Sequence, residues 1–65
     1  MTKEYSLVGI DGNAFSIMAY VSRAMKENGF SKEEVKNYQN EAMSGNYDNL
    51  LIVSMRMINK INEMS

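Results

Sequence analysis

The clearest helix start in the sequence is the stretch Phe30-Ser31-Lys32-Glu33-Glu34-Val35. Ser31 followed three residues later by Glu34 is the pattern of a capping box, in which each side chain accepts a hydrogen bond from the other residue's backbone N–H. Phe30 before the cap and Val35 at the fourth helical position have the spacing of a hydrophobic staple. We therefore predict a helix over residues 32–44, ended by Gly45.

An earlier helix is predicted over residues 13–28, because apolar residues recur there at spacings of three and four. These residues are Ala14, Ile17, Met18, Val21, Ala24 and Met25. Asp11 or Asn13 can cap the free backbone N–H groups at the start of this helix. Gly29 suits the left-handed backbone position that commonly follows a helix C-terminus.

A third helix is predicted over residues 47–62, with Asn46 or Asp48 as its cap. One amphipathic face is formed by Leu50, Leu51, Met55, Ile58 and Ile61, and further apolar residues lie beside or beyond it. The apolar arc is wider than a single core-facing side needs. Two interpretations stay open: a central helix that is packed on both sides, or an interface formed by Tyr47, Ile52, Val53, Met57 and Met64.

Sixty-five residues allow one domain, residues 1–65, and the predicted fold is an all-α domain of three helices with an extended N-terminal arm over residues 1–10. Part of the arm alternates apolar and polar residues, so it is either an ordered coil or a short strand completed by another subunit. The predicted core consists of Phe15, Ile17, Met18, Val21, Met25, Phe30, Val35, Tyr38, Leu50, Leu51, Met55 and Ile58.

Composition excludes several classes of chemistry. The chain has no Cys and no His, so it has neither a thiolate nor the commonest metal ligand, and we predict no metal site, no cofactor and no enzymatic activity. A net charge of −1 argues against binding to nucleic acid. The longest apolar run, Leu50 to Val53, is far shorter than the roughly 20 residues that span a bilayer. We predict a location in the cytosol and no association with membranes.

One loop has the composition of an anion-binding site. Residues 9–13 contain two glycines and lead into a helix start, where free N–H groups attract phosphates. Asp11, Gly12 and Asn13 are therefore candidate ligand-binding residues. The competing and favoured interpretation is a tight turn in which Asp11 caps the helix, and the negative charge of Asp11 would also repel a phosphate.

Two stretches of the chain, residues 7–18 and residues 41–51, resemble the two sequence blocks of a family of short phage and prophage proteins. The resemblance covers about residues 5–55 and implies an accessory phage protein that redirects or disarms the host. It assigns no catalytic residue. Asn46 stands where the family pattern is expected to have Asp, and Asn49 where it is expected to have His, so any acid or His chemistry at that loop would be lacking here.

The leading functional hypothesis is a non-enzymatic accessory protein, encoded by a phage or mobile element, that binds and modulates a host bacterial protein. The alternative is a homo-oligomer that sequesters a small anionic or nucleotide ligand at the helix start near Gly12 and Asn13. A third hypothesis is a purely structural role as a small subunit of a larger assembly.

Overall fold

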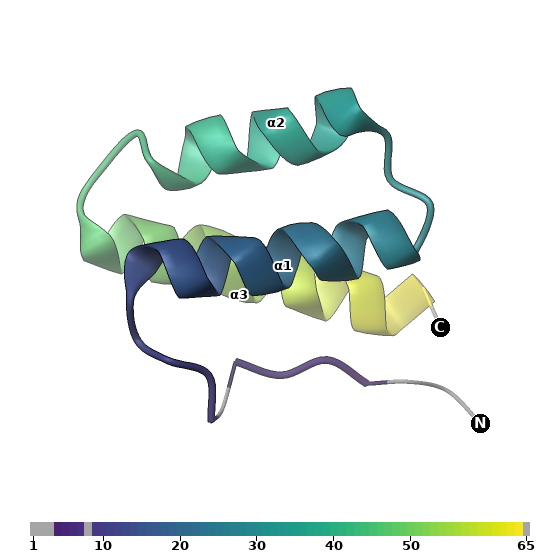
Figure 1. Cartoon of the computed structure of the whole chain (residues 1–65), viewed down its shortest axis with the longest axis horizontal. Coiled ribbons are helices and arrows are strands. Elements are labelled where there is room, and N and C mark those ends of the chain that lie inside the picture. Colours follow the sequence, from purple (N-terminus) through teal and green to yellow (C-terminus); the bar gives the residue numbers. More distant parts are fainter. Residues whose placement is uncertain (1–3, 8, 65) are drawn as a thin grey trace.

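Three helices follow one another along the chain: α1 (Ala14–Glu27), α2 (Lys32–Ala42) and α3 (Tyr47–Met64). The computed structural model describes residues 4–7 and 9–64. Each helix packs against both of the others, so the all-α, three-helix prediction is confirmed (Figure 1). No helix in the described part of the chain is long and apolar enough to cross a membrane.

The boundaries of α1 are set by hydrogen bonds that the local sequence supplies. Asn13 is the N-cap, and its side-chain oxygen accepts from the N–H of Phe15 at 2.8 Å. At the other end, the N–H of Phe30 donates to the carbonyl of Met25 at 3.0 Å, and that of Gly29 donates to Lys26 at 3.2 Å. This pair is a Schellman motif, and it requires the positive φ of 86° that Gly29 adopts.

The capping box of α2 is confirmed, with the Ser31 N–H donating to Glu34 at 2.9 Å and the Glu34 N–H donating to Ser31 Oγ at 3.1 Å. The bond from the Ser31 N–H, which the Glu34 carboxylate accepts, is the main cause that lowers the pKa of this carboxyl, because it favours the charged form. The helix ends at Ala42, two residues earlier than predicted.

The early end of α2 has a cause outside the helix. The side-chain amide of Asn49 donates to the carbonyls of Glu41 and Ala42, at 3.0 and 3.4 Å, and so satisfies groups that another helical turn would otherwise satisfy. A Cβ at Gly45 would lie 3.0 Å from the Asn49 side chain, which is a tight contact, so a glycine favours this close approach.

The core lies between the three helices, with eight of its twelve predicted members buried. Phe30 and Leu51 are only partly buried and pack against the core. Phe15 and Met55 were predicted wrongly, since they are 74% and 55% exposed. The buried hydrophobic residues that the prediction missed are Tyr5, Ala24, Ala42, Val53 and Ile61.

The two errors have one geometric reason. At 100° per residue, Phe15 lies roughly 100° from the centre of the buried face of α1, and Met55 lies roughly 120° from that of α3. Both residues therefore lie at or beyond the edge of the buried face of their helix. A three- or four-residue spacing to a core neighbour is therefore not enough to place them in the core.

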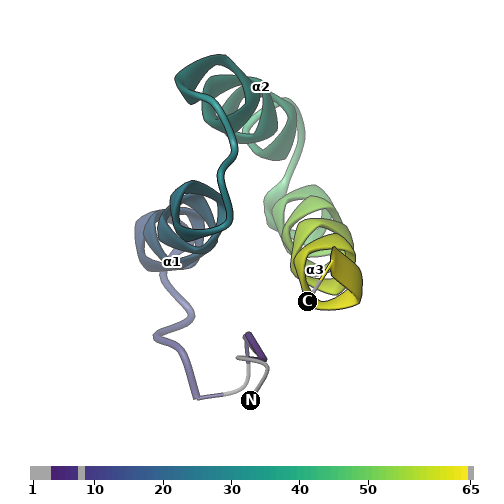
Figure 2. The same ribbon diagram turned by 90° about the vertical axis from the view of Figure 1, so that its right-hand side faces the viewer.

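The N-terminal arm is an ordered coil, with no strand in its described residues. It passes along the bundle between α1 and α3, on the side opposite α2 (Figure 2). The carboxamide of Asn62 holds the backbone of Tyr5 at both groups, accepting from its N–H and donating to its carbonyl at 2.9 Å each. A side chain on α3 thus makes the pair of hydrogen bonds that a neighbouring strand would make.

The side chain of Tyr5 fixes the arm to α1. Its ring is buried and meets the ring of Tyr20 edge to face at a centroid distance of 6.2 Å. Its hydroxyl donates to Glu27 at 2.7 Å and accepts from Asn28 at 3.3 Å. The arm therefore completes the core.

Candidate functional site

Three helix ends meet at one end of the bundle, where α1 begins, α2 ends and α3 begins (Figure 1). A hollow of about 310 Å³ opens there, which we call the end pocket. The residues that line it are Ala14, Phe15, Met18, Ala42, Met43, Gly45, Asn46, Tyr47 and Leu50. Its surface is mainly apolar, as is usual for a site that receives another molecule.

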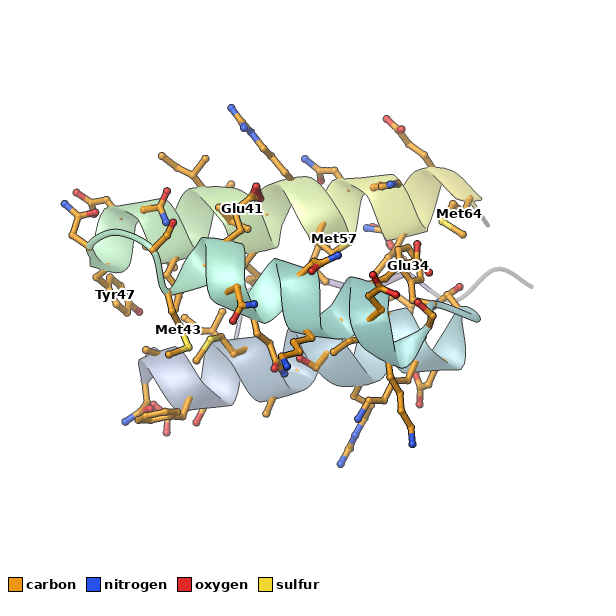
Figure 3. The ribbon with its side chains drawn as sticks, turned by 90° about the horizontal axis from the view of Figure 1, so that it is seen from above. Glu34, Glu41, Met43, Tyr47, Met57 and Met64 are labelled. Atoms are coloured by element: carbon orange, nitrogen blue, oxygen red, sulfur yellow. The ribbon has the colours of Figure 1, made fainter. Side chains whose placement is uncertain are left out.

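Three large apolar side chains of the end pocket face solvent. Phe15 is 74% exposed, Met43 62% and Tyr47 45%, and each comes from a different helix or its cap. Figure 3 shows Met43 and Tyr47 at the same end of the bundle. Single exposed apolar residues are ordinary on protein surfaces, whereas a contiguous group around a hollow is typical of an interaction site.

Local hydrogen bonds hold the rim of the end pocket in place. The cap at Asn13 places Phe15 in the first turn of α1, and Asn46 places Tyr47 at the first position of α3 by accepting from the Asn49 N–H at 3.0 Å. The Tyr47 hydroxyl donates to the carbonyl of Gly12, which ties the start of α3 to the loop before α1. The Tyr47 ring is therefore preorganised, which lowers the entropy that binding to it would cost.

The residues predicted to bind an anion, Asp11 to Asn13, make hydrogen bonds within the chain. Asp11 accepts from the Asn13 N–H at 3.1 Å, and Asn13 itself caps α1. The carbonyl of Gly12 is occupied by the Tyr47 hydroxyl. The helix start is capped within the chain, but the favoured interpretation was wrong in its choice of Asp11, because Asn13 is the N-cap. The anion hypothesis gains no support from this geometry.

The residues predicted as an interface on the last helix separate into different environments. Tyr47, Ile52 and Met64 are exposed, Met57 is partly buried, and Val53 lies in the core at 9% exposure. Only Tyr47 lines the end pocket. Ile52 lies on the side of α3 opposite its buried face, because it is about 180° from the centre of that face.

Two pocket residues, Phe15 and Met43, were missed as site residues by the sequence interpretation. The signal for Phe15 is present in the sequence, since its angular position departs from the buried face of α1. Met43 carries the same signal, since it lies roughly 105° from the centre of the buried face of α2.

Buried polar groups elsewhere in the described chain are structural. The hydroxyls of Tyr38 and Ser54 share a buried hydrogen bond of 2.6 Å, and burial raises the pKa of the Tyr38 phenol, which keeps it neutral. Every buried side-chain nitrogen and oxygen among residues 4–7 and 9–64 has a hydrogen-bond partner. The same residues contain no group of acidic side chains arranged to hold a metal ion.

Comparison of the chain with protein-family models, with curated proteins and with solved structures gave no match. The family resemblance in residues 7–18 and 41–51 therefore stays a prediction.

Proposed function

We propose that the chain is a non-enzymatic protein-binding module that receives an apolar part of another protein in the end pocket. Following the resemblance in its two sequence blocks, we propose a host bacterial protein as the partner and a phage or mobile element as the source of the chain. Binding would take place in the host cytosol and would modulate the partner.

The observation that carries this proposal is the convergence of exposed Phe15, Met43 and Tyr47 on one hollow. A cavity of about 150 Å³ is enough for a benzene ring, so a hollow of about 310 Å³ has room for roughly two large side chains. Aromatic residues and Met are also enriched at the centres of protein interfaces.

Magnitudes indicate what kind of complex this surface supports. Burying Phe15 and Met43 would yield about 1.5–3 kcal/mol each, or about 3–6 kcal/mol together. Association costs about 4–15 kcal/mol in lost translational and rotational freedom. The end pocket therefore acts as an anchor, and a stable complex needs further contacts around it.

Photo-crosslinking tests the proposal. A photoreactive phenylalanine analogue placed at residue 15 should crosslink a discrete protein in bacterial lysate, and Met43→Ser should abolish that product. The matched control places the same analogue at residue 55, because Met55 is exposed to 55% but does not line the end pocket. The same products from both positions, or none from residue 15 across several plausible hosts, would contradict the proposal.

A further inference from the structure

Two neighbouring residues of the N-terminal arm, Tyr5 and Ser6, make hydrogen bonds that tie the arm to the helices. Their partners, which we call the arm site, are Tyr20, Glu27, Asn28 and Asn62. These partners belong to α1, to its C-cap and to α3. The arm site therefore lies wholly on the helical bundle, and the arm occupies it as a separate segment would.

The chemistry of the arm site selects an extended segment that carries a tyrosine. The Asn62 carboxamide pairs with both backbone groups of one residue, which is the pairing that an extended peptide offers. The Tyr5 ring is only 8% exposed, and its hydroxyl bonds to Glu27 at 2.7 Å and to Asn28 at 3.3 Å. Every copy of the chain carries this segment, so the arm of a second copy would make the same contacts.

A single turn shapes the connection between the arm and α1. The Ile10 N–H donates to the Leu7 carbonyl at 3.3 Å, and Gly9 within this turn has a φ of 84°. A Cβ at Gly9 would meet no atom within 4 Å, so the glycine is required by its left-handed backbone and not by lack of space. The turn therefore depends on one residue.

Opening this turn gives the arm enough reach for a neighbouring molecule. Residues 7–13 span about 23–25 Å when fully extended. The domain extends 16 Å along its shortest axis. The arm can thus pass from its own α1 to the arm site of a copy that packs beside it.

From these contacts, we infer that the arm site also binds the arm of a second copy, which produces an arm-exchanged dimer. Each chain then places its Tyr5 against the Asn62 and Glu27 of the other, and both arm sites are filled. Exchange of an identical element is a low-cost route to a dimer, because the contacts of the closed monomer are kept. The inference is independent of the docking function, because no residue of the arm site lines the end pocket.

The turn at Gly9 sets the balance between the closed monomer and the dimer. A short connection gives the arm an effective concentration on the order of millimolar at its own arm site. The wild-type chain is therefore monomeric at micromolar concentrations, and the exchanged dimer has a Kd on the order of 1 mM. A residue that disfavours positive φ removes this preference, because the extended connection of the exchanged form does not need the turn.

Gly9→Ala tests the inference by sedimentation equilibrium from micromolar to millimolar concentrations. A left-handed backbone is unfavourable for alanine in the closed form, and two connections open in each dimer, so the Kd should fall about 30–700-fold to about 1–30 µM. Gly9→Val should tighten the dimer further, because β-branched residues adopt a positive φ even less readily. In a mixture of isotope-labelled and unlabelled Gly9→Ala chains, filtered NMR spectra should show contacts between Tyr5 of one chain and Tyr20 of the other.

Gly12→Ala is the matched control, because it makes the same change in the same connection. Gly12 has no positive φ, and a Cβ there would lie 3.5 Å from the Tyr47 hydroxyl, which is an ordinary contact. This variant should stay monomeric at the micromolar concentrations at which Gly9→Ala is a dimer. Thermal melts verify that the variants are folded.

Three results would overturn the inference. They are Gly9→Ala and Gly9→Val variants that both stay monomeric, a dimer without contacts between Tyr5 and Tyr20 of different chains, and a Gly12→Ala variant that dimerises as tightly as Gly9→Ala. None of these results bears on the end pocket, whose function is tested separately by photo-crosslinking at residue 15.

Discussion

Replacing Asn62 by Ala removes the clamp that holds the N-terminal arm. Two hydrogen bonds to the Tyr5 backbone are lost, each worth about 0.5–1.5 kcal/mol, so the gross loss is about 1–3 kcal/mol. Alanine recovers about 0.6 kcal/mol, because it has the higher helix propensity. The expected net loss in the free energy of unfolding is about 0.5–2.5 kcal/mol. A central value of about 1.5 kcal/mol corresponds to a fall in Tm of about 6–12 °C.

Urea denaturation measures the free energy of unfolding, and amide hydrogen exchange reads out the arm. In Asn62→Ala, the Tyr5 N–H should lose its protection while amides in the middle of α1 keep theirs, because the clamp acts on the arm alone. Asn59→Ala is the matched control: Asn59 is an exposed asparagine on the same helix, and its replacement brings the same gain in propensity.

The difference between Asn62→Ala and Asn59→Ala measures what the Asn62 side chain contributes, which includes the two hydrogen bonds to Tyr5. A difference of less than about 0.5 kcal/mol, or a Tyr5 amide that is already unprotected in the wild type, would refute the assignment of the arm as an integral part of the domain.

Three further predictions follow from the core, the cap and the rim. Tyr38→Phe should lower the free energy of unfolding by about 1–3 kcal/mol, because it leaves the fully buried Ser54 hydroxyl without its partner. In a double-mutant cycle measured by denaturation, Tyr38→Phe combined with Ser54→Ala should cost less than the sum of the two single changes. The pKa of Glu34 is lowered in the folded state, so the stability that its charged carboxylate contributes is present above the ordinary pKa of 4.5 and is lost as the pH falls through the folded pKa. The difference in Tm between wild type and Glu34→Gln should therefore shrink on acidification. A difference that stays constant with pH would contradict the capping role. Phe15→Ser should change the free energy of unfolding by less than about 0.5 kcal/mol, because the ring is exposed. Met25→Ala, at a site with 0% exposure, should cost about 2–5 kcal/mol. Similar losses for the two variants in calorimetry would show that Phe15 belongs to the core.

The sequence predicts those parts of the fold that depend on short-range interactions. The capping box at Ser31 and Glu34, the glycine stop at Gly29 and the cap at Asn13 or Asp11 are each completed within a few residues, so their patterns can be read locally. The apolar periodicity likewise predicts three helices, with bounds that agree to within two residues.

Local sequence patterns cannot predict contacts that join distant segments of the chain. Tyr5 and Asn62 are 57 residues apart in the chain, and no local rule pairs them. The end pocket depends on three helix ends that meet only after folding, and the carbonyls at the end of α2 are bonded by Asn49 from the next helix. Phe15 was predicted as core because spacing alone does not show the centre of an apolar face.

The arm and the end of α3 have a practical consequence for experiments. Glu4 lies beside the C-terminal half of α1, and Met64 lies beside the corner formed by Asn28, Gly29 and Phe30. The C-terminal ends of α1 and α3, where these residues lie, are at the end of the bundle remote from the end pocket (Figure 1). An affinity tag, a fluorescent protein or a surface tether can therefore be joined at either terminus and leave the exposed aromatic rings accessible to solution.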